Sequence, residues 1–171
     1  GPMHALAGSI AAASDGIGVW YLFGDETTED EGPNMQQIPT HGQHSFLRLC
    51  SAMGEAYCLH TPEAVTTALR RGYNTVDHPF RAGPFFLLMP MNTQPRVLRQ
   101  FSLEELPSTP PPRLGPAADD GAYTKAIRAL KKAQRIVIKV GGGARAAGHE
   151  IADFAELIDG VIVTSPLVSG I

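Results

Sequence analysis

The chain has few cysteines, no excess of basic residues and no long apolar run, and each shortage excludes a class of protein. Cys50 and Cys58 are the only cysteines among 171 residues, so a disulfide framework is excluded and reduced thiols are expected. The 14 Lys and Arg are outnumbered by 17 Asp and Glu, and the net charge of −3 predicts no nucleic-acid partner. No apolar run approaches the roughly 20 residues of a membrane-spanning helix. We therefore expect a soluble, cytoplasmic protein with no membrane partner.

Motifs for nucleophilic catalysis and for metal binding are also lacking. There is no Gly-x-Ser-x-Gly elbow, and neither cysteine has a local Cys/His signature. Soft metal ligands are present but lack the paired spacings of structural zinc sites; they are His41, His44, Cys50, Cys58 and His60. The acidic run from Asp25 to Glu31 lacks the spacing of a calcium loop. The sequence thus predicts no metal site, and the histidines and thiols are interpreted as surface and core residues.

Buried apolar runs separated by helical patterns indicate an α/β fold in the first part of the chain. Ile17 to Phe23 is interpreted as a central parallel strand, and Gly24 to Ser45 as a long loop. Thr61 and Pro62 have the residue types of a helix N-cap and first helical position. The other predicted elements are a helix over His4 to Ser14, a short helix over Phe46 to Ala52, a short strand over Tyr57 to Leu59, a helix ending near Val76 and a strand over Pro84 to Met89.

A proline-rich segment, Leu106 to Pro116, is interpreted as a stiff connector to a second α/β unit. Asp119 and Asp120 provide caps for a helix, and a strand after it ends in three glycines. The elements predicted here are a helix over Ala122 to Ala133, a strand over Arg135 to Val140, a helix from about Ala144 to Ile158 and a strand over Val161 to Thr164. The predicted fold is α/β, with parallel sheets flanked by helices in two partial three-layer domains (residues 1–105 and 119–171) joined by a linker (residues 106–118).

The glycine loop allows several interpretations. Gly141-x-Gly143-x-x-Ala146 fits the dinucleotide fingerprint, in which glycines let backbone amides approach a pyrophosphate. The acid that such a fingerprint needs at the end of the next strand is missing, because that strand ends in Val163-Thr164-Ser165. Nicotinamide binding, binding of another nucleotide part, and a tight strand-to-helix turn all remain open.

The segment from Arg81 to Gln94 resembles the end of the pyrimidine-binding domain in thiamine diphosphate-dependent enzymes of the acetolactate synthase type. That family reads R-x-G-P-V, an apolar strand and I-P-x-D-V-Q. Downstream, Ala126 to Ala133 and the Gly-Gly-Gly-Ala-Arg loop are similar to the start of its central, Rossmann-like domain, and Ser165 to Gly170 is similar to its T-x-x-x-G-K-G segment. Upstream, the residues from Gly1 to Gly8 resemble G-P-G-x-x-N-A-L-x-G.

The resemblance implies that the chain is a fragment of a larger enzyme, inactive alone, that makes or breaks a carbon-carbon bond next to a carbonyl. Its catalytic glutamate would precede Gly1, so no catalytic residue is assigned, and the G-D-G motif that holds Mg²⁺ would lie beyond Ile171. Gly1 and Pro2 would line the pyrimidine side of thiamine diphosphate. The residues Gly141, Gly142 and Gly143 would face a groove that holds FAD in some relatives.

Departures from the family pattern leave the substrate open. Met3, His4 and Asn92 replace family residues, and the family's lysine near Gly54-Glu55 is missing. A decarboxylase, a carboligase (lyase or transferase chemistry) and a dione hydrolase of the same family remain alternatives, with a 2-oxo acid or ketone as substrate. The family's cofactor lies between subunits, which implies a dimer or tetramer. The alternative outside the family is a non-catalytic nucleotide-binding or regulatory module built on the glycine loop.

Overall fold

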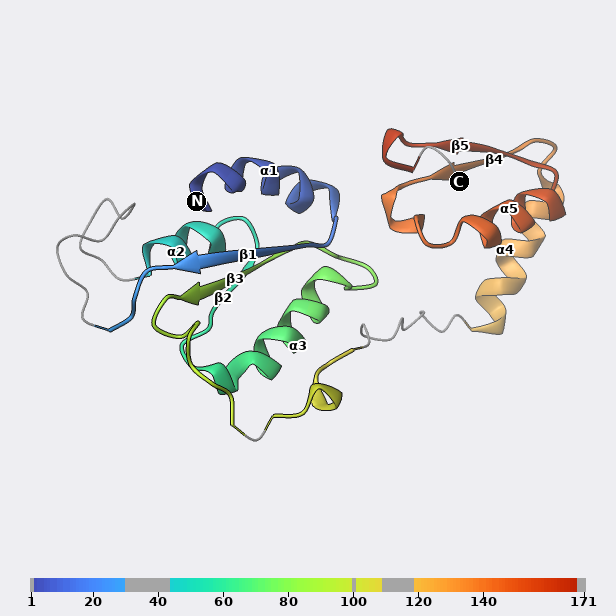
Figure 1. The fold of residues 1–171 in the computed structure, drawn as a ribbon. Helices are drawn as coiled ribbons and strands as arrows, with labels where there is room; N and C mark the ends of the chain where they lie inside the picture. The colour runs from blue at the N-terminus through green and yellow to red at the C-terminus, as the bar shows by residue number, and fades with distance from the viewer. Residues whose placement is uncertain (1, 30–43, 100, 109–118, 169–171) are drawn as a thin grey trace. The chain divides into compact units, whose positions relative to one another are not determined.

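The computed structural model describes residues 2–29, 44–99, 101–108 and 119–168, and the chain divides into two compact units, Gly1–Pro112 and Arg113–Ile171 (Figure 1). Each unit contains short parallel strands flanked by helices, as the α/β prediction requires. Most of the predicted linker, from residue 109 to 118, lies outside the described residues.

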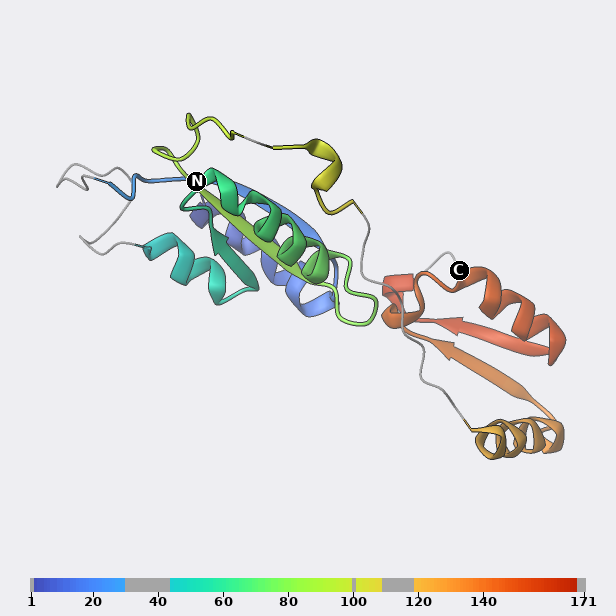
Figure 2. The same ribbon diagram turned by 90° about the horizontal axis from the view of Figure 1, so that it is seen from below.

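The first unit is a three-stranded parallel sheet between two helical layers (Figures 1 and 2). Its main elements are α1 (Pro2–Asp15), β1 (Val19–Asp25), α2 (Ser45–Ser51), β2 (Glu55–Cys58), α3 (Val65–Val76) and β3 (Pro84–Pro90). Because side chains alternate along a strand, β3 directs Phe86 and Leu88 toward α1 and α2, and Phe85 and Leu87 toward α3. The fully apolar sequence of β3 thus supplies both halves of the core.

The strand order is β1-β3-β2, so β3 is the central strand and β1 pairs with β3 alone among the described residues. The interpretation of Ile17 to Phe23 as a central strand is therefore wrong. Leu22 in β1 is 60% exposed, whereas Phe85, Phe86 and Leu88 in β3 are fully buried. The apolar run correctly predicts a strand, but no residue of β1 reaches the burial of the central strand β3.

Small residues set how closely α3 approaches the sheet. Ala68 is fully buried against β3, and Gly72 faces the indole ring of Trp20 on β1. Trp20 also makes edge contacts with Tyr73 and Phe85, at ring-centroid distances of 5.7 and 5.2 Å. The helix begins at Val65 after a short 3₁₀ turn over Pro62–Ala64, and Thr61 caps that turn without a side-chain hydrogen bond.

The second unit consists of α4 (Asp120–Lys132), β4 (Ile136–Val140), α5 (Gly148–Leu157) and β5 (Gly160–Thr164), with β4 and β5 parallel. Asp119 caps α4 as predicted, because its carboxylate accepts a hydrogen bond from the Ala122 amide at 2.6 Å. One face of the small sheet packs against α5. The other face exposes Val137, Val161 and Val163, so the predicted third layer of this unit does not cover it within the described residues.

Candidate functional site

The carboxyl ends of β1, β2 and β3 meet at one edge of the first sheet, because the strands are parallel. Two residues that follow β3 form hydrogen bonds there with the segments that follow β1 and β2. Asn92 accepts a hydrogen bond from the Thr28 amide at 3.0 Å and donates one to the Thr28 hydroxyl at 3.0 Å. Thr93, which is only 3% exposed, donates to the His60 carbonyl at 3.2 Å. The Asn92-Thr93 segment thus connects the ends of all three strands.

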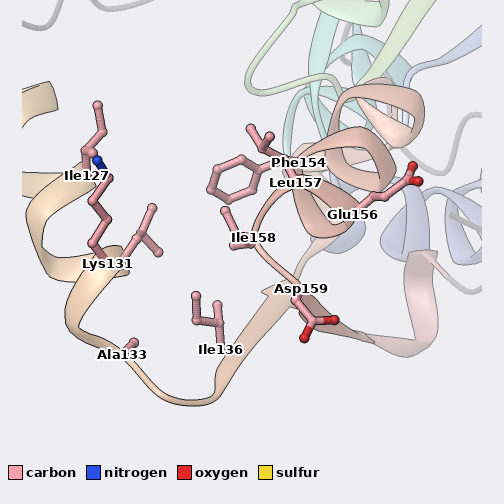
Figure 3. A pocket seen from close by; sticks show the side chains of 10 residues that line it. Ile127, Lys131, Ala133, Ile136, Phe154, Glu156, Leu157, Ile158 and Asp159 are labelled. Carbon is pink, nitrogen blue, oxygen red and sulfur yellow. The ribbon is translucent and has the colours of Figure 1, made fainter.

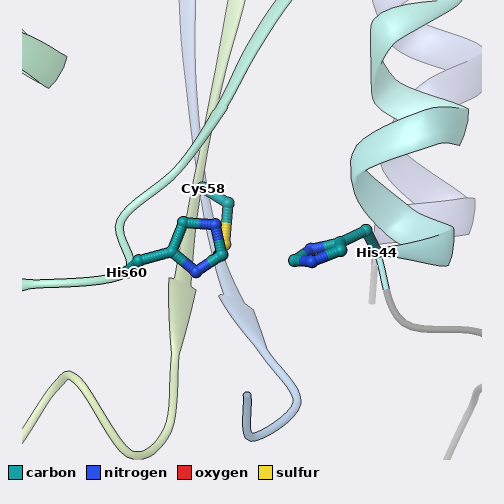
Figure 4. Close-up of side chains that lie close together, drawn as sticks. All are labelled: His44, Cys58 and His60. Carbon is teal, nitrogen blue, oxygen red and sulfur yellow. The ribbon is translucent and has the colours of Figure 1, made fainter.

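This edge brings His44, Cys58 and His60 together (Figure 4). Their ligand atoms all lie within 4.8 Å of one another, with 4.0 Å between Cys58 Sγ and His60 Nδ1. The two imidazole rings are nearly perpendicular, at 81°, with centroids 5.3 Å apart. Figure 4 shows the Cys58 sulfur between the ring of His60 and that of His44. Cys58 is buried, His44 is half-buried, and His60 is exposed.

Cys58 is buried and His60 is exposed, as expected for a core thiol and a surface histidine, and the structure also brings both of them close to His44. Their separation along the chain matches no zinc motif, and only the folded sheet edge unites them. Cys50 lies in the core on α2, and His41 lies outside the described residues.

Burial controls the chemistry of the thiols. Desolvation, and secondarily the negative charge of Asp25, raises the pKa of Cys58 from 9.0 to about 11. The same causes, in the same order, raise the pKa of Cys50 to about 11. Both thiols are therefore protonated at neutral pH and unsuited to act as free nucleophiles. Asp25 is the last residue of β1 and therefore brings a carboxylate to this edge of the sheet.

The predicted pyrimidine-side residues lie at the start of the chain. Gly1 is outside the described residues, and Pro2 is the buried first residue of α1. The N-terminal end of α1 lies toward the carboxyl ends of the strands in both views (Figures 1 and 2). Pro2 therefore lies toward the same carboxyl edge of the sheet as the cluster of His44, Cys58 and His60.

The glycine loop follows β4, but it does not open directly into a long helix. Gly142–Ala144 forms a 3₁₀ turn, and α5 begins only at Gly148, not near Ala144 as predicted. The several glycines, with their low helix propensity, favour this delayed start. A Cβ added to Gly141 or Gly143 would have no neighbour within 4 Å, so both positions leave open space beside the backbone.

A buried polar atom lies beside this loop. The Ser165 amide donates to the Val140 carbonyl at 2.9 Å, which joins the residue after β5 to the end of β4. Ser165 Oγ is buried and has no hydrogen-bond partner among the described residues. An unsatisfied hydroxyl beside open glycine backbone is suited to a polar ligand.

An apolar hollow of about 680 Å³ lies between α4 and α5, near the beginning of β4 (Figure 3). Ile127 from α4 and Phe154 and Leu157 from α5 line it, and Leu157 is 82% exposed. Its lining is mostly hydrocarbon, with the charged side chains of Lys131, Glu156 and Asp159 among it, so the hollow mainly offers surface for packing.

Sequence reasoning missed the His44, Cys58 and His60 cluster and the unsatisfied Ser165 hydroxyl. Both arise from residues that follow or precede neighbouring elements at the same edge of a sheet.

Across the described residues, no helix combines the length and the apolar character required to cross a membrane. Comparison with protein-family models gave no match, and the search of curated proteins likewise gave no match.

Proposed function

We propose that the chain is part of a thiamine diphosphate-dependent enzyme that makes or breaks a carbon-carbon bond next to a carbonyl. The observation that carries the proposal is the agreement between motif order and element order. The segment resembling R-x-G-P is followed by β3, the central strand, and Asn92-Thr93-Gln94 follows β3 at the carboxyl edge of the sheet. The segment resembling G-G-G-A-R follows β4 in a separate α/β unit.

Within this proposal, the chain supplies one wall of the cofactor site. Pro2 is the first residue of α1, has no backbone N–H and is apolar, and the resemblance assigns it to the pyrimidine side of the cofactor. Asn92 and Thr93 hold the loops of the carboxyl edge in fixed positions. When bound with Mg²⁺, thiamine diphosphate supplies a thiazolium ylid that acts as an electron sink for a 2-oxo acid or ketone.

Exposed apolar surfaces support the further proposal that the parent is a homodimer or tetramer and that other segments cover this chain. Leu22 on the edge strand, Val137 on the small sheet and Leu157 beside the hollow are each at least 60% exposed. Apolar surface of this kind, on sheet edges and helix faces, is typical of packing interfaces.

The test is made on the parent protein encoded with its flanking sequence. Titration with thiamine diphosphate and Mg²⁺, followed by an assay of 2-oxo acid decarboxylation, should show binding and turnover. Decarboxylation without ligation, ligation of two substrates, and hydrolysis of a cyclic dione distinguish the lyase, transferase and hydrolase alternatives. Absence of both cofactor binding and turnover refutes the proposal.

The second candidate is a non-catalytic nucleotide-binding or regulatory module at the glycine loop. The open backbone at Gly141 and Gly143 and the unsatisfied Ser165 hydroxyl support it. Calorimetry of the chain alone with FAD, NAD and ADP tests it. Micromolar binding that weakens in Ser165→Ala favours the module, and absence of binding leaves the enzyme fragment as the better proposal.

A further inference from the structure

The structure assigns a transition-metal site to His44, Cys58 and His60, with zinc as the natural ion and with one coordination position left to a water or a small oxygen ligand. None of the residues proposed above to bind a cofactor is part of this site. It does not depend on thiamine diphosphate, and it can be tested on the chain alone.

The distances are close to those of a formed site. For bond lengths near 2.05 Å to nitrogen and 2.3 Å to sulfur, tetrahedral geometry separates two ligand atoms by roughly 3.4 to 3.6 Å. The pair Cys58 Sγ and His60 Nδ1 is at 4.0 Å, and all three ligand atoms lie within 4.8 Å of one another. Contraction by roughly 0.4 to 1.4 Å, within the range of side-chain rotation, therefore completes the site.

The donor set selects the ion. One thiolate and two imidazoles are borderline-soft ligands that suit zinc, cobalt and copper, whereas Mg²⁺ and Ca²⁺ require oxygen ligands. Three protein ligands with an open fourth position are the pattern of zinc sites that bind an exchangeable water, and closed structural sites use four. The negative charge of Asp25 near Cys58 further favours a cation.

The surroundings hold the ligands and leave a path for the ion. The Leu59 amide donates to the Leu88 carbonyl at 2.8 Å, and Thr93 donates to the His60 carbonyl at 3.2 Å, so the backbone carrying Cys58 and His60 is fixed on the central strand. Cys58 closes the inner side of the site from the core, while exposed His60 opens the outer side to solvent.

Cobalt titration of the chain without a histidine tag tests the assignment. Co²⁺ should produce visible d–d bands of tetrahedral intensity and a thiolate charge-transfer band, and Zn²⁺ should abolish both. Cys58→Ser should remove the charge-transfer band. Cys50→Ser is the matched control, because Cys50 is a second buried thiol in the same core cluster and should leave the spectrum unchanged.

His60→Ala provides a test at an exposed position where the fold is little affected. Replacing a residue that only hydrogen-bonds to a metal ligand weakens metal binding 10- to 100-fold. Removing the ligand His60 itself should therefore weaken metal binding by more than about 100-fold. His149→Ala, at an exposed histidine of α5, is the matched control and should keep full affinity. The assignment is overturned if no charge-transfer band forms, if the band survives Cys58→Ser or disappears in Cys50→Ser, or if His60→Ala binds as tightly as His149→Ala.

Discussion

Gly72 in α3 is the position where a single added methyl group tests the packing of the first unit most directly. A Cβ there would overlap the outer ring of Trp20, with Cζ2 at 2.7 Å and two further ring atoms closer still. Alanine raises helix propensity by about 1 kcal/mol relative to glycine. Overpacking of a core contact costs about 1–3 kcal/mol, and Trp20 is confined by Tyr73 and Phe85. We expect Gly72→Ala to destabilise the chain by a net of up to about 2 kcal/mol.

The assay is urea unfolding followed by far-UV circular dichroism, a probe that does not depend on the single tryptophan. Gly8→Ala in α1 is the matched control, because its Cβ would meet nothing within 4 Å and should stabilise the helix by up to about 1 kcal/mol. Trp20→Phe removes the outer ring atoms, so the double variant should recover about 1–2 kcal/mol relative to additivity. Equal stabilisation by Gly72→Ala and Gly8→Ala, or strict additivity with Trp20→Phe, would refute the helix-to-strand packing.

Three further predictions concern the core, a helix cap and the pH dependence of stability. Phe86→Ala should lower the free energy of unfolding by about 3–5 kcal/mol, because Phe86 is fully buried and stacks on Tyr21 at 4.8 Å; a loss below 1 kcal/mol in urea unfolding contradicts the central place of β3. Asp119→Ala should reduce the helicity of α4 and cost about 1 kcal/mol, whereas Asp119→Asn should keep most of the cap, as measured by circular dichroism. In the metal-free chain, stability should be insensitive to Cys50 and Cys58 below pH 9 and should fall between pH 9 and 11, because the unfolded chain releases thiol protons that the folded chain retains. Each thiol accounts for up to about 3 kcal/mol, and the double Ser variant should show a shallower loss in urea unfolding over this range.

The elements of the chain could be predicted from sequence because local signals determine them. The Pro84–Pro90 strand is an unbroken apolar run, and α4 begins at the predicted Asp119 cap. Helix α1 and the short helix α2 also match their predicted positions within two residues. Periodicity and capping act over a few residues, so one sequence is enough to detect them.

The order of strands could not be predicted in this way. Both β1 and β3 are apolar, and hydrophobicity alone does not distinguish an edge strand covered by helices from a central strand. Pairing depends on contacts between residues far apart in sequence, such as Trp20 with Phe85 in the β1–β3 register. The start of α5 was also predicted too early, because the alanines after the glycine loop favour a helix while Gly148 and a 3₁₀ turn delay it.

The cluster of His44, Cys58 and His60 results from the topology of the fold. Sequence motifs for metal sites describe only the spacing of ligands along the chain. Helix α2 has seven residues and spans roughly 10 Å, and β2 has four residues and spans roughly 13 Å. The two elements pack against each other and are joined by a tight turn over residues 52–54, so the chain returns to the edge from which it started. The residue before α2 and the residues at the end of β2 must then be neighbours, and these are His44, Cys58 and His60. A helix and a strand of similar length joined by a short turn therefore bring ligands 14 to 16 residues apart into one site, and sequence searches for metal sites should include this arrangement beside the short paired motifs.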